Sequence, residues 1–110
     1  DVFVVRAGES VPVDGRVLDL GCGSAPVLSQ LRLKGASCTG LEYSEDMLRH
    51  AKARLQSMQL DVGDLHRGDC RETQFEAASF DVVVCLGVIS YVEDYAVVLR
   101  QIKRLLKPGG

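Results

Sequence analysis

Apolar positions along this chain of 110 residues recur with two different periods, and these periods predict strands and helices in turn. Nearly unbroken apolar runs at 17–20, 37–42 and 80–86 are typical of strands buried in a parallel sheet, and a weaker run lies at 65–68. Helical spacing predicts helices at about 25–34, 45–58 and 94–106. Strands that alternate with helices indicate an α/β fold with a doubly wound, Rossmann-like parallel sheet.

Capping signals mark the ends of the predicted helices. Pro26 suits a first helical turn because its missing N–H would have no intrahelical partner there. Gly35 is expected to cap the end of the first helix, and Ser44 the start of the second. The expected buried faces consist of Val27, Leu28 and Leu31; of Met47, Leu48, Ala51, Leu55 and Met58; and of Val98, Leu99, Ile102 and Leu105.

Residues 1–16 fit this alternation least well. Val2-Phe3-Val4-Val5 is rich in β-forming residues, and Val13-Asp14-Gly15-Arg16 predicts a turn. The sequence therefore predicts an extended or hairpin lead-in over 1–16, followed by one main domain over 17–110.

The strongest candidate chemistry lies in the run VLDLGCGSAP at 17–26. An apolar strand leads into Gly21 and Gly23, and glycines let the backbone approach a ligand closely. A strand, a glycine turn and a helix N-terminus together form the usual nucleotide-binding side of an α/β sheet. A dinucleotide site would need a third glycine where this chain has Pro26, which disfavours NAD without excluding it.

Charge and cysteine usage narrow the classes of partner and location. The formal net charge of −2 offers no electrostatic footprint for nucleic acid, and no apolar run has the roughly 20 residues of a membrane span. The four cysteines, at 22, 38, 70 and 85, lack the clustered spacing of a zinc site. We therefore expect no metal, mostly buried free thiols and a cytoplasmic location.

Five segments, taken together and in order, resemble the class I S-adenosylmethionine-dependent methyltransferases of the small-molecule type. They are VLDLGCGSAP (17–26), LEYSEDMLRHAK (41–52), GDC (68–70), SFDVVVCLGVISYVED (79–94) and LLKPGG (105–110). The resemblance implies that 17–110 is the N-terminal, cofactor-binding half of such a domain, with an incomplete sheet of about four of the family's seven strands. Where many members have glycine this chain has Ala25, which suits the position if its φ stays negative.

The resemblance also implies S-adenosylmethionine as cofactor and a role for several side chains. Asp19 would engage the amino group of the methionine portion, Glu42 both ribose hydroxyls, and Asp69 the adenine amino group. The full candidate cofactor site is Asp19, Gly21, Cys22, Gly23, Glu42, Tyr43, Met47, Asp69, Cys70 and Leu86.

Each of these assignments has a structural alternative. Glu42 could be a solvent-facing acid at a strand end, Met47 a helix-core residue, and Asp69 a turn former. Tyr91 stands where many small-molecule members have a histidine that faces the acceptor, or it packs under the last helix. No residue is identified as catalytic.

The implied function is methyl transfer to a small-molecule acceptor, with this chain supplying the cofactor site. No nucleic-acid or membrane partner is evident, and no oligomeric state is indicated. One alternative is a methyltransferase-like nucleoside-binding or scaffold module that is inactive, for instance because the chain is a fragment. A less favoured alternative is a fragment of an NAD-dependent oxidoreductase.

Overall fold

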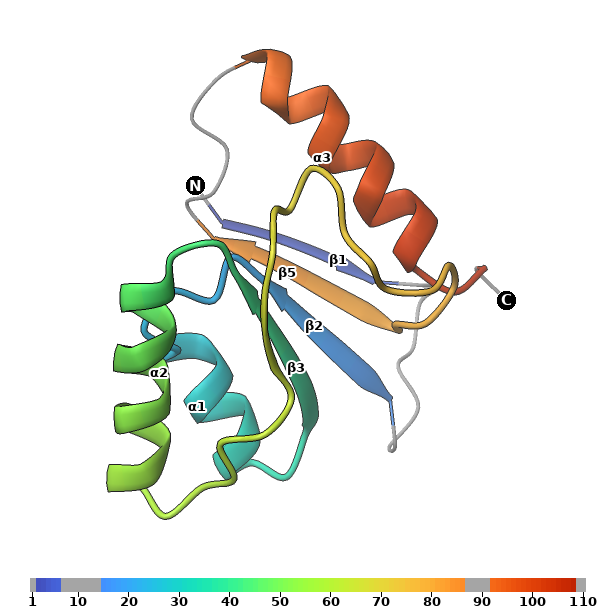
Figure 1. Ribbon diagram of the computed structural model, residues 1–110. Helices are drawn as coiled ribbons and strands as arrows, with labels where there is room; N and C mark the ends of the chain where they lie inside the picture. The colour runs from blue at the N-terminus through green and yellow to red at the C-terminus, as the bar shows by residue number, and fades with distance from the viewer. Residues whose placement is uncertain (1, 7–14, 87–91, 109–110) are drawn as a thin grey trace.

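The computed structural model describes residues 2–6, 15–86 and 92–108. The described elements, in chain order, are β1 (Val2–Arg6), β2 (Arg16–Leu20), α1 (Pro26–Leu33), β3 (Ser37–Glu42), α2 (Glu45–Ser57), β4 (Leu65–Arg67), β5 (Val82–Leu86) and α3 (Val92–Leu105). They form one layer of sheet with helices on both faces, as Figure 1 shows.

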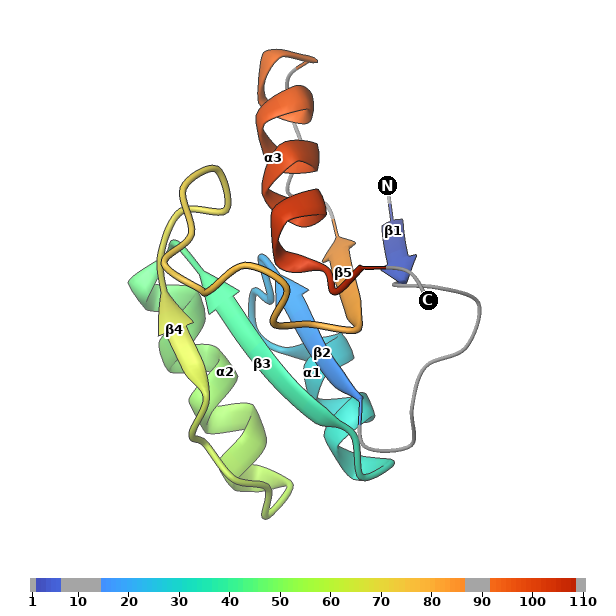
Figure 2. The ribbon, with the colours of Figure 1, turned by 90° about the vertical axis from the view of Figure 1, so that its right-hand side faces the viewer.

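The sheet has five strands in the order β1-β5-β2-β3-β4. β2 pairs in parallel with β3 and β5, and β3 pairs in parallel with β4. The four predicted parallel strands and the α/β class are thus confirmed. β1 adds an antiparallel edge strand against β5, and the turned view of Figure 2 shows it at the opposite edge from β4.

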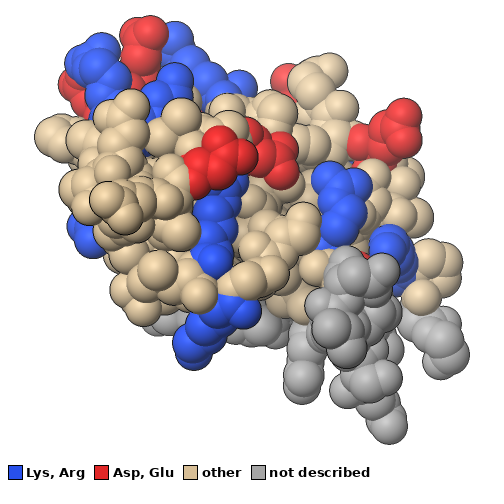
Figure 3. Space-filling view, turned by 90° about the horizontal axis from the view of Figure 1, so that it is seen from below, with Lys and Arg blue, Asp and Glu red and all other residues tan. Residues whose placement is uncertain are grey.

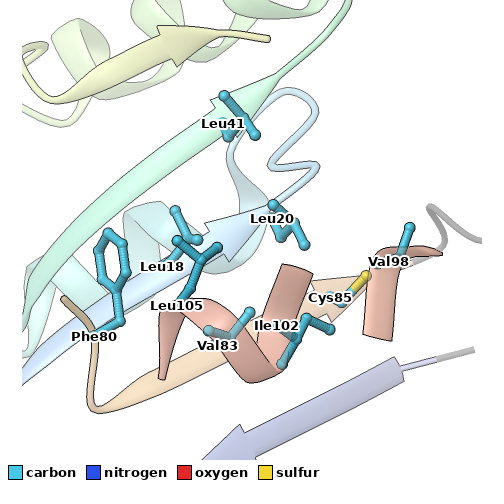
Figure 4. Close-up of a cluster of buried hydrophobic side chains, with 9 residues drawn as sticks. All are labelled: Leu18, Leu20, Leu41, Phe80, Val83, Cys85, Val98, Ile102 and Leu105. Carbon is cyan, nitrogen blue, oxygen red and sulfur yellow. The ribbon is translucent and has the colours of Figure 1, made fainter. Parts of the chain in front are cut away.

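Two apolar cores hold the helices against the two faces of the sheet. The core under α3 gathers nine buried side chains from β2, β3, β5, α3 and their flanks (Figure 4): Leu18, Leu20, Leu41, Phe80, Val83, Cys85, Val98, Ile102 and Leu105. The core under α1 and α2 consists of Cys22, Ala25, Leu28, Cys38, Ala51 and Leu55. Successive residues of a strand point to opposite faces, so β2 and β3 contribute to both cores.

Both predicted helix caps are present. The side chain of Ser44 accepts a hydrogen bond from the backbone N–H of Met47 at the start of α2. At the end of α1, Gly35 has a φ of +85° and donates its N–H to the carbonyl of Arg32, while Ala36 donates to the carbonyl of Leu31. This pair of bonds is the Schellman arrangement, and it uses carbonyls that the helix leaves without partners.

Three local expectations are wrong. Met47 and Leu99 are each 38% exposed, because they lie one residue outside the buried rows of α2 and α3. Ala25 has a φ of +67° instead of a negative one, and its side chain is fully buried in the core under α1. The left-handed conformation costs a non-glycine residue about 1–2 kcal/mol.

The segment between β4 and β5 is tied to α3 by hydrogen bonds in which Arg104 and Gln101 take part. The guanidinium of Arg104 donates to the carbonyl of Phe75 at 2.8 Å and to the hydroxyl of Thr73 at 2.8 Å. Lys107 contacts the carboxylate of Asp81 at 3.2 Å. Arg104 near the end of α3 and Lys107 just beyond it therefore both have intramolecular partners. None of the helices in the described part of the chain is long and apolar enough to cross a membrane.

Gly40 in β3 provides a test of this packing. A Cβ at residue 40 would lie 2.8 Å from the side chains of Leu28 and Leu65 and 3.0 Å from the sulfur of Cys22. We expect Gly40→Ala to lower the free energy of unfolding by about 1–3 kcal/mol through overpacking, as measured by urea denaturation.

Gly63→Ala is the matched control, because a Cβ at residue 63 meets only Asp61 at an ordinary contact distance of 3.4 Å. Its unfolding free energy should stay within about 0.5 kcal/mol of the parent value. Equal effects of the two substitutions would contradict the packing described for β3.

Candidate cofactor site

A pocket of about 410 Å³ opens at the carboxyl ends of the parallel strands. Figure 2 shows β2, β3 and β4 ending at the same edge of the sheet. The lining residues are Gly21, Gly23, Leu41, Glu42, Tyr43, Met47, Gly68, Asp69, Cys70 and Arg71. In open α/β sheets the crevice outside the carboxyl ends of the strands is the usual ligand site.

Glu42, the last residue of β3, fixes the wall of this pocket. One carboxylate oxygen accepts the backbone N–H of Gly23 at 2.9 Å, and the other accepts the backbone N–H of Ser44 at 2.9 Å. The carboxylate therefore joins the glycine turn after β2 to the start of α2. Gly23 has a φ of +56°, a conformation that glycine adopts without steric cost.

The contacts of Glu42 leave acceptor capacity on both of its oxygens. A carboxylate has about four acceptor positions, two on each oxygen. The two backbone N–H groups fill one position on each oxygen. A pair of neighbouring hydroxyl groups matches the two positions that remain.

Asp69, in the segment after β4, also lines the pocket and is held in a different way. Its carboxylate accepts the backbone N–H of Arg71 at 2.9 Å and the guanidinium of Arg71 at 2.8–3.2 Å. Asp69 therefore forms the predicted turn and also lines the pocket. Hydrogen bonds from Arg71 are the main cause that lowers the pKa of Asp69 below its usual value.

Of the three acidic candidates Asp19, Glu42 and Asp69, only Asp19 is almost fully buried, with 1% of its surface exposed. It accepts the backbone N–H of Leu28 near the start of α1, but among the described residues its Oδ1 has no hydrogen-bond partner. Burial, together with a smaller effect of the nearby charge of Glu42, raises the pKa of Asp19 to about 6. A buried acceptor without a partner is costly, so this oxygen suits a cationic N–H donor.

Seven of the ten predicted site residues line the pocket: Gly21, Gly23, Glu42, Tyr43, Met47, Asp69 and Cys70. Tyr43 is 67% exposed and Met47 is 38% exposed, so both offer apolar surface at its mouth. The sequence reasoning missed Leu41, Gly68 and Arg71. All three lie directly beside predicted residues, namely Glu42, Asp69 and Cys70, but nothing in the pattern singled out the side chain of Arg71.

The other three predicted residues are placed differently. Asp19 and Cys22 are buried beneath the glycine turn and do not line the pocket. Leu86 ends β5. Tyr91, the residue suggested to face the acceptor, lies outside the described residues.

Three of the four cysteine thiols are buried rather than activated. Burial raises the pKa of Cys22 and of Cys38 to about 12, and that of Cys85 to about 11. Such thiols stay protonated at neutral pH and are poor nucleophiles. Within the described residues, no group of three or more potential metal-ligating side chains comes together.

Comparison with known proteins gives one consistent family. Residues 18–110 match a family model described as a methyltransferase domain. A ubiquinone biosynthesis O-methyltransferase of Pseudomonas aeruginosa is 39% identical over 97 residues, which are 86% of this chain and 41% of that protein. The chain therefore spans about two-fifths of the length of the curated relatives it matches.

Solved structures share the fold. A protein from Pyrococcus horikoshii superposes with a TM-score of 0.77 at 31% identity, covering 87% of this chain and 46% of that one. A SAM-dependent methyltransferase from Methanosarcina mazei superposes with a TM-score of 0.73 at 25% identity, covering 90% of this chain and 50% of that one.

The contrast between two buried aspartates gives a prediction about stability. The raised pKa of Asp19 means that the folded protein binds this proton more tightly than the unfolded chain, so its ionisation destabilises the fold as pH rises through about 6. We expect Asp19→Asn to leave the unfolding free energy unchanged near pH 4 and to raise it by about 3 kcal/mol at pH 7.5, as measured by urea denaturation.

Asp81 provides the control of opposite sign. It is also buried, but it accepts the backbone N–H of Arg16 at 2.8 Å and the ammonium of Lys107, and these contacts lower its pKa. Asp81→Asn should therefore destabilise the protein at pH 7.5, and less so as pH falls through the lowered pKa. A stability loss in both variants would contradict the account of Asp19.

Proposed function

This chain belongs to the methyltransferase domain family, and we propose that its pocket binds S-adenosylmethionine for methyl transfer to a small-molecule acceptor. The observation that carries the proposal is the set of three carboxylates at the carboxyl edge of the sheet, each with a different unused acceptor capacity. Asp19 has a buried oxygen with no partner among the described residues, Glu42 has one open position on each oxygen, and Asp69, which also lines the pocket, has one acceptor position left.

The functional groups of S-adenosylmethionine match this set one by one. The two ribose hydroxyls fit the paired positions of Glu42, and the adenine amino group fits Asp69. The ammonium of the methionine portion fits the unpartnered oxygen of Asp19, directly or through one water. Tyr43 and Met47 supply apolar surface for the adenine faces.

The bound cofactor supplies a methyl group on a sulfonium, which is already an activated leaving group. The task left to this chain is to bind and orient, and orientation alone contributes up to about 7–11 kcal/mol in well-aligned reactions. The glycine turn after β2 and the start of α2, which Glu42 joins together, perform this task. No general base is assigned.

A small-molecule acceptor is supported by the name of the Pseudomonas aeruginosa relative and by the charge of this chain. Basic and acidic side chains are interspersed on the surface drawn in Figure 3, without a continuous basic region on that face. The buried thiols of Cys22, Cys38 and Cys85 support a reducing, cytoplasmic location.

Binding of S-adenosylhomocysteine to Glu42→Gln tests the proposed site. The amide keeps the shape of the side chain but replaces one acceptor oxygen with a donor, so the paired contact to the ribose is lost. Isothermal titration calorimetry should show a Kd raised at least about tenfold, the size expected for hydrogen bonds to a charged group.

Glu45→Gln is the matched control, because Glu45 is exposed in the first turn of α2 and does not line the pocket. Its Kd should equal that of the parent chain. Binding of NAD instead of S-adenosylhomocysteine would support the oxidoreductase alternative, and no binding of either ligand would contradict the proposed function.

The raised pKa of Asp19 also predicts how binding depends on pH. Only the ionised carboxylate attracts the ligand ammonium, and with a pKa of about 6 about one-tenth of the sites are ionised at pH 5. The affinity for S-adenosylhomocysteine should therefore fall about tenfold between pH 7.5 and pH 5. Asp19→Asn should bind weakly at both pH values and lose this dependence; an unchanged pH profile in that variant would exclude Asp19 as its source.

A further inference from the structure

We propose that Arg71 is a positioning residue that aims the carboxylate of Asp69 into the pocket and thereby sets a preference for 6-amino purines over 6-oxo purines. The inference rests on the proposed function, because it takes Asp69 as the residue that contacts the purine edge. It concerns a residue that the sequence pattern did not indicate and that lines the same pocket.

Arg71 contacts Asp69 through both its main chain and its side chain. Its backbone N–H donates to Oδ1 at 2.9 Å, its Nε lies 3.1 Å from Oδ1 and 3.2 Å from Oδ2, and its Nη2 lies 2.8 Å from Oδ2. A two-pronged guanidinium contact of this kind fixes the plane of a carboxylate as well as its place. Asp69 thus has three donor groups around about four acceptor positions, and one position remains.

Asp69 depends on this contact more than Glu42 depends on any single neighbour. Glu42 is held by two backbone N–H groups from two different elements, after β2 and before α2. Asp69 lies in the segment that follows β4, and among the described residues every hydrogen bond to its carboxylate comes from Arg71. Removal of the guanidinium leaves only the turn N–H, so the carboxylate gains freedom to rotate toward solvent.

The remaining acceptor position determines which purine is favoured. A carboxylate accepts hydrogen bonds only, so it favours the exocyclic amine of adenine. In a 6-oxo purine the carbonyl oxygen would lie against the carboxylate oxygen of Asp69, so two acceptors would meet without a hydrogen between them. A carboxylate that is held in place cannot turn away to relieve this repulsion. A carboxylate that is free to rotate discriminates less between the two purines.

Orientation, rather than ionisation, is the contribution of Arg71 at neutral pH. The usual pKa of aspartate is near 4, so Asp69 would be ionised at pH 7.5 without its partner. Loss of Arg71 therefore leaves the charge of Asp69 in place and changes only how firmly it is aimed.

The test compares S-adenosylhomocysteine with S-inosylhomocysteine, which carries a 6-oxo purine, by isothermal titration calorimetry at pH 7.5. We expect Arg71→Ala to weaken binding of the adenosyl ligand about tenfold and of the inosyl ligand less than about threefold, so that the affinity ratio falls at least threefold. Arg71→Lys should give an intermediate ratio, because an ammonium cannot make the two-pronged contact.

Arg49→Ala is the matched control. Arg49 forms an exposed ion pair with Asp46 within α2 and does not line the pocket. Its replacement changes the net charge as much as Arg71→Ala does, but should leave the ratio of the affinities for the adenosyl and inosyl ligands unchanged. Urea denaturation of each variant separates a loss of stability from a change in ligand preference, since a purely structural role for Arg71 would weaken both ligands equally.

The outcomes distinguish this inference from the function on which it rests. If the parent chain binds neither adenosyl nor inosyl ligand, the proposed function is wrong. If the parent chain prefers the adenosyl ligand and Arg71→Ala keeps or increases the ratio, the proposed function stands and the role of Arg71 is wrong. A reduced ratio in Arg71→Ala with an intermediate value in Arg71→Lys supports the role.

Discussion

The pocket depends on one carboxylate that holds two main-chain segments together. Glu42 accepts N–H groups from Gly23 and from Ser44, so the turn after β2 and the entry to α2 are fixed relative to the end of β3. Both N–H groups belong to residues outside regular hydrogen-bonding ladders, and a buried N–H group needs such a partner. The same contact therefore satisfies the backbone and leaves one acceptor position on each oxygen of a residue that lines the pocket.

Three acids around one pocket create an electrostatic cost that a cationic ligand relieves. Asp19 is buried, its Oδ1 has no hydrogen-bond partner in the part of the chain that the structure describes, and both burial and the charge of Glu42 raise its pKa. Asp69 avoids this cost through Arg71, and Asp81, at the other end of the sheet, avoids it through Arg16 and Lys107. The contrast shows that the chain can neutralise a buried acid where the fold requires it, so the unpaired state of Asp19 is typical of a functional site.

The strands and most of the residues that line the pocket follow from local patterns in the sequence. β3 has the bounds of its apolar run, 37 and 42, and Ser44 caps α2 because a hydroxyl next to an acidic first turn favours a helix start. The side chain of Arg71 and the pairing of β1 with β5 did not follow. Arg71 contacts Asp69 only two residues away, but hydrophobic periodicity carries no information about which polar side chains meet within an irregular segment. The pairing of strands about 80 residues apart depends on tertiary geometry that the periodicity does not encode.

Ala25 shows how the two cores and the pocket constrain each other. Its carbonyl accepts the N–H of Ser29 and its methyl group is fully buried beside Leu28, so the residue is fixed in a left-handed conformation that glycine would adopt more easily. A glycine here would relieve about 1–2 kcal/mol of strain but lose a buried methyl group worth about 0.8 kcal/mol and gain freedom in the unfolded chain. These terms nearly cancel, which explains how alanine is tolerated. Because Ala25 faces the core rather than the pocket, the substitution leaves the cofactor site its full width.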